Sequence, residues 1–291
     1  MTSFHESAPP PDAVPSLREK AEQDGYLFFR SLVDQELILR ARRDIVRILE
    51  QAGWIDAGTD PIEAISSHPA RIAGSPEFTP IYDRIQCLES FHTLAHEPGL
   101  IQVSESILGQ DTFLQPSNIA RVIFPNAFEH TTPPHQDYIH IQGTPDVWTA
   151  WIPLGDCPSE MGGLTVLAGS HRQGILPVTR SLGAGSLKTD VSGADGQWVT
   201  SPFRIGDVLF FHSHTIHQGI PNRSGNRIRL SVDFRYQRAS DPIMDKVLGP
   251  HQGRLSWEDV YEGWESDAYH YYWENYSLKT VPKDPWPVAN D

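Results

Sequence analysis

The chain has 291 residues, of which 39% are hydrophobic, so it can bury a sizeable core as one large or two small domains. Its 37 acidic residues outnumber 23 basic ones and give a formal charge of −14, which disfavours nucleic acid or an anionic membrane surface as a partner. The 2 cysteines are too few for a disulfide framework and favour a reduced, cytoplasmic protein.

The first residues lack the features of a targeting or membrane segment. Residues 1–15 are polar and rich in proline, so they do not resemble a signal peptide and are expected to be a disordered tail. No apolar run approaches the roughly 20 residues that span a bilayer. A single domain without a membrane partner is therefore expected over residues 16–291, and a homo-oligomer is compatible with the sequence.

Helices are predicted in the N-terminal part of this domain. A first strand is expected over 25–32, followed by an amphipathic helix that begins at an Asp34 N-cap and stops at Gly53. Two more helices are expected over 80–95 and 98–108. The first helix carries four arginines that are expected to form a solvated face: Arg40, Arg42, Arg43 and Arg47.

Strands are predicted from about residue 112 to residue 240. Apolar runs separated by turn signals occur at 120–124, 147–154, 163–167, 206–211 and 227–236. Helices first and strands later indicate an α+β fold with a sandwich or barrel core. The extension over 254–291 is rich in Trp and Tyr and is expected to pack a helix on the sheet; a lid over a pocket or a dimer contact is the alternative.

Three side chains are candidate ligands for one metal ion. His135 and Asp137 are two residues apart, and His217 follows far downstream. Residues i and i+2 on a strand point the same way, about 6–7 Å apart, so His135 and Asp137 can bind one metal ion. Together with His217 they would occupy one face of the ion, which is the facial triad of non-haem Fe(II) oxygenases.

A basic side chain follows the distal histidine. Arg229 lies twelve residues after His217, and Ser231 follows at i+2 on the same strand face. A guanidinium beside a hydroxyl suits a carboxylate, because the guanidinium donates two parallel charge-assisted hydrogen bonds. The distal carboxylate of 2-oxoglutarate would need such a site, while its 2-oxo acid end would chelate the metal and leave one position for dioxygen.

The chain resembles the phytanoyl-CoA dioxygenase family over roughly residues 20–240. The resemblance rests on ordered motifs: His135-Gln136-Asp137, Trp151-Ile152-Pro153-Leu154, the stretch from Glu160 to Gly174, Gly206-Asp207-Val208, His217 and Asn222-Arg223-Ser224. It implies a double-stranded β-helix (jelly-roll) core with flanking N-terminal helices and a C-terminal helical extension. It also implies Fe(II) and 2-oxoglutarate as cofactors, and hydroxylation or another oxidation of a small-molecule substrate with release of succinate and carbon dioxide.

By this resemblance His135, Asp137 and His217 would be the iron ligands. Two neighbouring histidines, His212 and His214, compete with His217 for the distal position. They share a face with each other in an extended segment but not with His217. The position of His217 before the Asn222-Arg223-Ser224 motif favours it.

One departure concerns the expected anchor of 2-oxoglutarate. Many relatives have an arginine eleven residues after the distal histidine, where this chain has Ile228. Arg227 and Arg229 flank that position and share one strand parity. Arg229 is preferred because Ser231 completes the Arg-x-Ser pair.

Three further residues are candidates for cofactor contacts. Thr149 and Trp151 share a face if 147–154 is one strand, and that face either lines the cofactor pocket or belongs to the core. Gln115 is a candidate for a polar contact to 2-oxoglutarate.

Two other functions use parts of the same pattern. A metal-dependent hydrolase could use the same two histidines and aspartate but would not need the Arg-x-Ser anchor. A non-catalytic jelly-roll binding protein would keep the fold, although the intact triad disfavours it. Asp137 fills the position at which a halogenase would have Ala or Gly, so oxidation of the substrate is favoured over halogenation.

Overall fold

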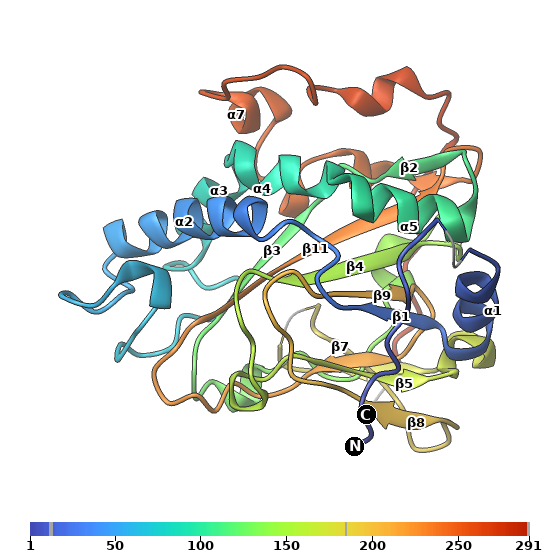
Figure 1. The fold of residues 1–291 in the computed structure, drawn as a ribbon, viewed down its shortest axis with the longest axis horizontal. Helices are drawn as coiled ribbons and strands as arrows, with labels where there is room; N and C mark the ends of the chain where they lie inside the picture. Colours follow the sequence, from blue (N-terminus) through green and yellow to red (C-terminus); the bar gives the residue numbers. More distant parts are fainter. Residues whose placement is uncertain (12–13, 184, 290–291) are drawn as a thin grey trace.

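A computed structural model of the chain describes residues 1–11, 14–183 and 185–289. The other residues belong to the predicted tail, to a Gly-rich loop and to the end of the C-terminal extension, and lie outside the described residues. Two antiparallel sheets face each other, and helices cover the outer face of the larger sheet (Figure 1). The mixed α and β content predicted from the sequence is confirmed.

The larger sheet has the strand order β1-β9-β4-β11-β2, with β3 also paired to β11, and every pairing is antiparallel. Its strands are β1 (Tyr26–Phe29), β2 (Thr112–Leu114), β3 (Ile119–Ile123), β4 (Trp148–Pro153), β9 (Val208–His212) and β11 (Arg229–Arg238). The smaller sheet has the order β10-β5-β8. Its strands are β5 (Leu164–Ala168), β8 (Gln197–Val199) and β10 (His217–Gly219). Two further pairs are β6 (Val178–Arg180) with β7 (Leu187–Thr189), and β12 (Ile243–Met244) with β13 (Thr280–Val281).

The central strand β11 is buried on both faces, and the two faces differ in chemistry. Its apolar residues join the core beneath the helices: Leu230, Val232, Phe234 and Tyr236. Alternate residues on a strand point to opposite sides. The other face therefore carries a row of buried polar residues: Arg229, Ser231, Asp233, Arg235 and Gln237. We call this row the polar face of β11.

Helices cover the apolar face of the larger sheet (Figure 1). They are α1 (Val14–Asp24), α2 (Gln35–Gln51), α3 (Thr79–Gln86), α4 (Glu89–Thr93) and α5 (Pro98–Leu108). The predicted N-cap of α2 is confirmed, since the Asp34 carboxylate accepts a hydrogen bond from the Glu36 amide at 2.8 Å. The helix predicted over 80–95 is divided, because Leu88 has an extended backbone between α3 and α4.

The arginines of α2 do not all face solvent as predicted. Arg40, Arg43 and Arg47 are exposed, but Arg42 is buried. Its guanidinium donates to the carbonyls of Ile62, from Nε at 2.7 Å, and Leu154, from Nη1 at 3.0 Å. Arg42 therefore joins α2 to the following loop and to the end of β4.

The N-terminal residues are not the disordered tail that their composition predicts. Phe4 is buried and its ring lies 5.0 Å from that of Phe28 and 5.3 Å from that of Tyr26. Thr2 and Glu6 form parallel bridges with Val199 and Phe28. A buried aromatic ring and several backbone hydrogen bonds together dock this polar, Pro-rich segment on the sheets.

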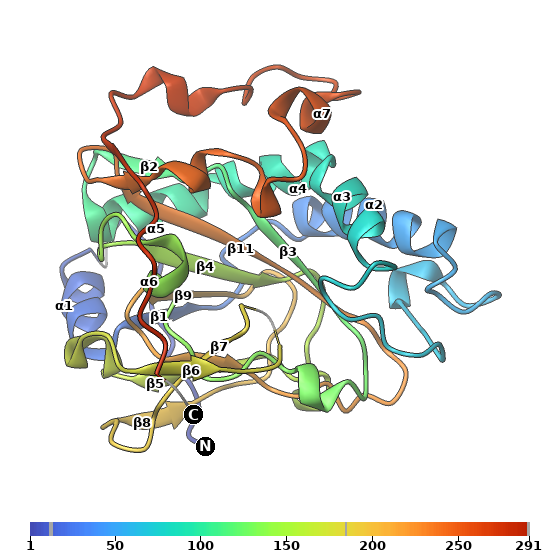
Figure 2. The ribbon, with the colours of Figure 1, turned by 180° about the vertical axis from the view of Figure 1, so that it is seen from behind.

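The C-terminal extension contains little helix, in contrast to the prediction. Its α-helix α7 (Trp257–Tyr261) has five residues and begins with a capping box at Ser256. Residues 277–289, which we call the C-terminal strap, add β13 and then cross the short helix α6 (Tyr138–Ile141) (Figure 2). The Gln142 side-chain amide exchanges two 2.8 Å hydrogen bonds with the backbone of Asp284. Among the described residues, no helix combines the length and the apolar character needed to cross a membrane.

Candidate metal centre

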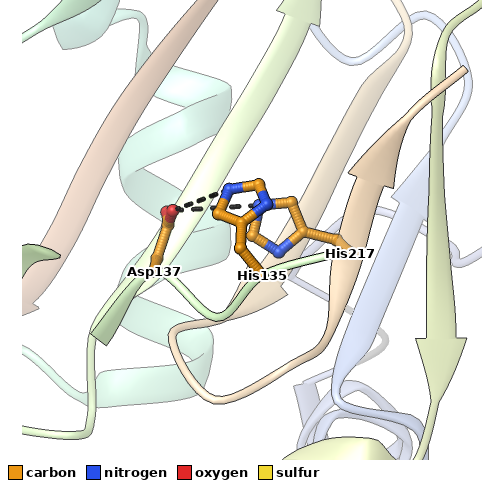
Figure 3. A group of neighbouring side chains, drawn as sticks. All are labelled: His135, Asp137 and His217. Carbon is orange, nitrogen blue, oxygen red and sulfur yellow. Dashed lines mark ion pairs between the residues drawn. The ribbon is translucent and has the colours of Figure 1, made fainter. Parts of the chain in front are cut away.

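His135, Asp137 and His217 come together between the two sheets (Figure 3). One potential ligand atom of each lies within 4.8 Å of those of the other two, and all three residues are buried. The backbones of His135 and His217 form an antiparallel bridge, with N–H to O distances of 2.9 and 3.0 Å. This pairing explains how residues so far apart in sequence meet.

Asp137 reaches the site by a different route from the predicted one. It is the residue before α6 and has helical backbone angles, φ −60° and ψ −32°, so it does not extend a strand from His135. Its Oδ1 nevertheless lies 3.7 Å from Nε2 of His135 and 3.8 Å from Nε2 of His217. The two-residue spacing brings the ligands together through a turn into a helix.

Both histidines present the same ring nitrogen to the site. Nδ1 of His135 lies 2.9 Å from the Pro133 carbonyl, and Nδ1 of His217 lies 3.0 Å from the Thr215 carbonyl. A carbonyl only accepts, so each Nδ1 carries the proton and each Nε2 keeps its lone pair. Such a bond to the remote nitrogen fixes the tautomer and the ring orientation of a metal-binding histidine.

Burial keeps these imidazoles neutral. Burial, and then the neighbouring His217, lower the pKa of His135 to about 3. Burial also lowers the pKa of His217. Neutral imidazoles are the form that binds a metal.

The second oxygen of Asp137 is fully occupied by protein donors. The Thr149 hydroxyl donates to Oδ2 at 2.9 Å, and Arg235 donates to it from Nε at 3.3 Å and Nη2 at 3.2 Å. Burial would raise the pKa of Asp137, but the Arg235 guanidinium and the hydrogen bond from Thr149 outweigh burial and keep it well below its ordinary value. Asp137 is therefore ionised, with Oδ1 free. Two neutral nitrogens and one such oxygen suit a divalent transition-metal ion.

Arg235 is a functional residue that the sequence analysis missed. It lies opposite Thr149 in the pairing of β11 with β4. Arg235 lies six residues after Arg229, and an even spacing places both side chains on the same face of a strand. This spacing indicates that Arg235 belongs to the polar face of β11. Nothing in the sequence alone indicates that its partner is Asp137.

The other end of the polar face holds the residues predicted to bind a carboxylate. Arg229 is buried and donates through Nη1 to the carbonyls of Gly162 and, at 3.1 Å, Gly163. Its Cζ lies 5.8 Å from the ring centre of Trp151. Three buried polar atoms here have no protein partner: Arg229 Nε, Ser231 Oγ and Trp151 Nε1. Native proteins satisfy nearly all such atoms, so three unpaired hydrogen-bond donors fit an absent acceptor such as a carboxylate.

The remaining predicted cofactor residues lie elsewhere. Arg227 precedes β11 and is half-buried, and its backbone bridges to Ile65. The Thr149 hydroxyl contacts Asp137, as described. Gln115 donates through its amide to Gln237 at 2.7 Å, at the end of β11 away from Arg229.

The competing histidines are not brought into the triad. His212 ends β9, with Nε2 3.5 Å from Asp146 Oδ1, and the His214 ring lies 5.0 Å from that of Tyr138. His140 is half-buried, with its ring centre 6.4 Å from that of His135. Within the described ranges, the side chains close enough to share an ion are His135, Asp137 and His217.

Comparison with known proteins identifies relatives over most of the chain. The sequence pattern of the phytanoyl-CoA dioxygenase family (PhyH) matches residues 21–231. A 1-deoxypentalenic acid 11-beta-hydroxylase of Streptomyces exfoliatus is 29% identical over 271 residues, which cover 86% of this chain and 90% of the relative. The Streptomyces arenae protein of the same name is 29% identical over 245 residues, or 79% and 83% of the two chains.

Solved structures share the fold at lower identity. The epimerase SnoN in complex with Fe3+, alpha ketoglutarate and nogalamycin RO has a TM-score of 0.58 and 22% identity, over 80% of this chain and 86% of that one. The alpha ketoglutarate dependent carbocyclase SnoK has a TM-score of 0.52 and 20% identity, over 82% and 88%. Since the family pattern matches residues 21–231, which is most of the chain and includes His135, Asp137, His217, Arg229 and Ser231, the chain belongs to the phytanoyl-CoA dioxygenase family.

Proposed function

We propose that the protein is an Fe(II)- and 2-oxoglutarate-dependent dioxygenase that hydroxylates, or otherwise oxidises, a small-molecule metabolite. The observation that carries the proposal is the pairing of two sites between the sheets. Three side chains close enough to share a metal ion lie towards one end of the polar face of β11, and three unpaired donors around Arg229 lie at the other. Family membership and relatives named as hydroxylases support the same activity.

The fold is proposed to serve this activity as one unit. We infer that the two facing sheets are the halves of a double-stranded β-helix, and that residues 16–291 act as a single domain. The fold shared with SnoN and SnoK supports this. The core between the sheets then provides a dry site, in which electrostatic contacts are stronger than in water.

The residues divide into two functional groups. His135, Asp137 and His217 would hold Fe(II) through Nε2, Oδ1 and Nε2, and leave the opposite face of the ion open. Arg229, Ser231 and Trp151 would hold the distal carboxylate of 2-oxoglutarate through their unpaired donors. Bound together, the ion and 2-oxoglutarate would supply the oxidation of the substrate by dioxygen, with release of succinate and carbon dioxide.

A metal-dependent hydrolase is the alternative, since zinc accepts the same three ligands. A hydrolase would not require a carboxylate at the three unpaired donors around Arg229, so it would not explain them. Succinate formation from 2-oxoglutarate with Fe(II) separates the two functions. Turnover with zinc but not with Fe(II) would favour the hydrolase.

The two candidate anchors can be distinguished by mutation. Arg229→Gln should raise the KM for 2-oxoglutarate about 10- to 100-fold, because charge-assisted hydrogen bonds are worth about 1.5–3 kcal/mol. Arg227→Gln is the matched control and should leave KM near the wild-type value. His135→Ala should abolish succinate formation. An Arg229→Gln enzyme with unchanged KM would contradict the proposed cofactor site.

A further inference from the structure

Asp233 lies in the middle of the polar face of β11, between the two groups described above. It is two residues from Arg235, which contacts Asp137, and two residues from Ser231. Side chains two apart on a strand share a face and lie about 6–7 Å apart. Asp233 also stands opposite Trp151 in the pairing with β4. Its carboxylate therefore lies between the candidate metal centre and the proposed anchor along the polar face of β11.

The two oxygens of this carboxylate have different surroundings. Oδ2 is 2.8 Å from Nε and 2.6 Å from Nη2 of Arg121, on β3. Oδ1 is buried and has no hydrogen-bond partner. A buried carboxylate oxygen without a donor is costly, so this atom is expected to receive a hydrogen bond from a bound molecule.

The missing donor is not supplied by 2-oxoglutarate. The unpaired atoms of Arg229, Ser231 and Trp151 can all donate, and they suit its carboxylate. Asp233 Oδ1 only accepts, so a carboxylate placed against it would be repelled. The molecule that satisfies Oδ1 must present an N–H or O–H group.

The net charge of the surrounding side chains discriminates between a charged ammonium group and a neutral hydroxyl group. Three guanidinium groups, those of Arg121, Arg229 and Arg235, lie on the inner faces of β3 and β11, against two carboxylates, those of Asp137 and Asp233. Binding of a divalent cation and of 2-oxoglutarate, a dianion, adds opposite charges that cancel, so the net positive charge of these side chains remains. A substrate ammonium group would be repelled by it, whereas a neutral hydroxyl would not.

We propose that Asp233, held in place by Arg121, binds a hydroxyl group of the substrate, and that the substrate is therefore a hydroxylated small molecule. This inference rests on the proposed function for the identity of the site. Asp233 would set specificity: the hydroxyl donates to Oδ1, and the rest of the molecule is directed towards the metal.

Three probes with one carbon skeleton test the proposal. They are 1-deoxypentalenic acid, the primary alcohol with a CH2OH group in place of its carboxyl group, and the hydrocarbon with a methyl group there. Binding is measured by calorimetry to the Co(II)-loaded protein with 2-oxoglutarate, without turnover. We expect the wild type to bind the alcohol at least tenfold more tightly than the other two. Equal binding of the three, or no binding of any, would overturn the proposal.

Two variants assign the preference to Asp233. Asp233→Asn keeps a similar shape, and Arg121→Met/Asp233→Leu replaces both partners by apolar groups, which avoids an unpaired buried charge. Both should lose the preference for the alcohol over the acid, because leucine has no polar atom and the asparagine amide, whose oxygen stays with Arg121, donates from Nδ2 to a carboxylate as well as to a hydroxyl. Their unfolding transitions show whether they fold. Arg238→Met/Asp146→Leu, which removes a more exposed ion pair at the end of β11, should keep it. A preference that survives in either folded Asp233 variant would refute the assignment.

A crystal structure of the Co(II) and 2-oxoglutarate complex provides an independent check. Asp233 Oδ1 should face the substrate space, and Trp151 Nε1 or another protein donor bonded to it would overturn the proposal. Because the binding assay needs no turnover, its failure is distinguishable from failure of the proposed function, which is absence of succinate formation by the wild type with Fe(II).

Discussion

A single atom, Oδ2 of Asp137, receives hydrogen bonds from Thr149 and Arg235. These donors occupy Oδ2 and leave Oδ1 facing Nε2 of His135 and Nε2 of His217, at 3.7 and 3.8 Å. Outer-shell partners of this kind typically change metal affinity 10- to 100-fold, roughly, when they are mutated. We predict that Arg235→Met weakens Co(II) binding by a factor in this range, as measured by calorimetry. The loss should grow as pH falls, because without the guanidinium the pKa of buried Asp137 rises and protons compete with the metal.

The control for this variant is Arg238→Met, on the same strand but paired with Asp146 near the surface. Its Co(II) affinity should match that of the wild type. The guanidinium of Arg235 also repels a dication, which acts in the opposite direction. Tighter binding in Arg235→Met would show that this repulsion outweighs the orientation of the carboxylate.

The triad could be predicted from the sequence and its supporting residues could not. His135, Asp137 and His217 stand in ordered motifs that identify them without knowledge of the backbone. The role of Arg235 depends on which residue of β4 lies opposite it and on how α6 turns Asp137 towards it. Strand register and the path of a turn follow from packing of the whole domain, which no local pattern in the sequence contains.

At the scale of elements, Arg42 joins three segments of the chain. It links α2, the loop at Ile62 and the end of β4 at Leu154. Removing a buried, hydrogen-bonded charge leaves carbonyl groups unsatisfied, which costs about 1–3 kcal/mol per group. We predict that Arg42→Met lowers the free energy of unfolding by about 2–4 kcal/mol in urea denaturation.

Arg43→Met is the matched control one residue away. Arg43 is exposed, with a 3.5 Å ion pair to Glu36 on the surface, and such pairs contribute about 0–1 kcal/mol. Its free energy of unfolding should change by less than about 0.5 kcal/mol. Equal effects of the two substitutions would contradict the structural role of Arg42.

Helices and strands whose apolar residues recur at regular spacing were predictable. Segments that are held by a few specific tertiary contacts were not. The apolar spacing of α2 and the apolar runs of β4, β9 and β11 correspond to the observed elements. Docking of the N-terminus depends on the Phe4 ring and the bridges of Thr2 and Glu6, and docking of the C-terminal strap on a few contacts such as Gln142 with Asp284. The N-terminus has no periodic apolar pattern, so its composition suggested disorder. The helical spacing in the C-terminal extension is limited to Trp257, Tyr261 and Trp264, and the observed helix α7 covers only Trp257–Tyr261.

At the scale of the whole molecule, buried neutral histidines should make the fold sensitive to acid. Burial lowers the pKa of His92 and His96 to about 4 and that of His251 to about 3, with neighbouring charges adding to the effect for the last two. The unfolded chain binds these protons near pH 6.5. Stability from these groups is therefore complete above pH 6.5 and is lost as pH falls towards 4.

The expected slope is up to about 1.4 kcal/mol per pH unit for each histidine. Urea denaturation between pH 7 and pH 5 measures it. His92→Gln should show a weaker acid dependence than the wild type, because His92 is buried between Gln86 and Asn118. The exposed His5→Gln should keep the wild-type dependence, and a pH-independent wild type would refute the prediction.

The backbone bridge between His135 and His217 bears on how the proposed metal centre would select its ion. The two imidazoles are brought side by side by backbone hydrogen bonds, so the proposed site does not depend on an ion to bring them together, in contrast to a zinc finger. Intrinsic affinity rises from Fe(II) through Co(II) and Ni(II) to Cu(II). A site whose geometry does not depend on the ion cannot discriminate against Co(II), Ni(II) or Cu(II) through a coupled folding step. If the proposed site binds iron, we therefore expect the metal content of a purified sample to follow the metals abundant during expression, and nickel from an affinity resin to compete with iron.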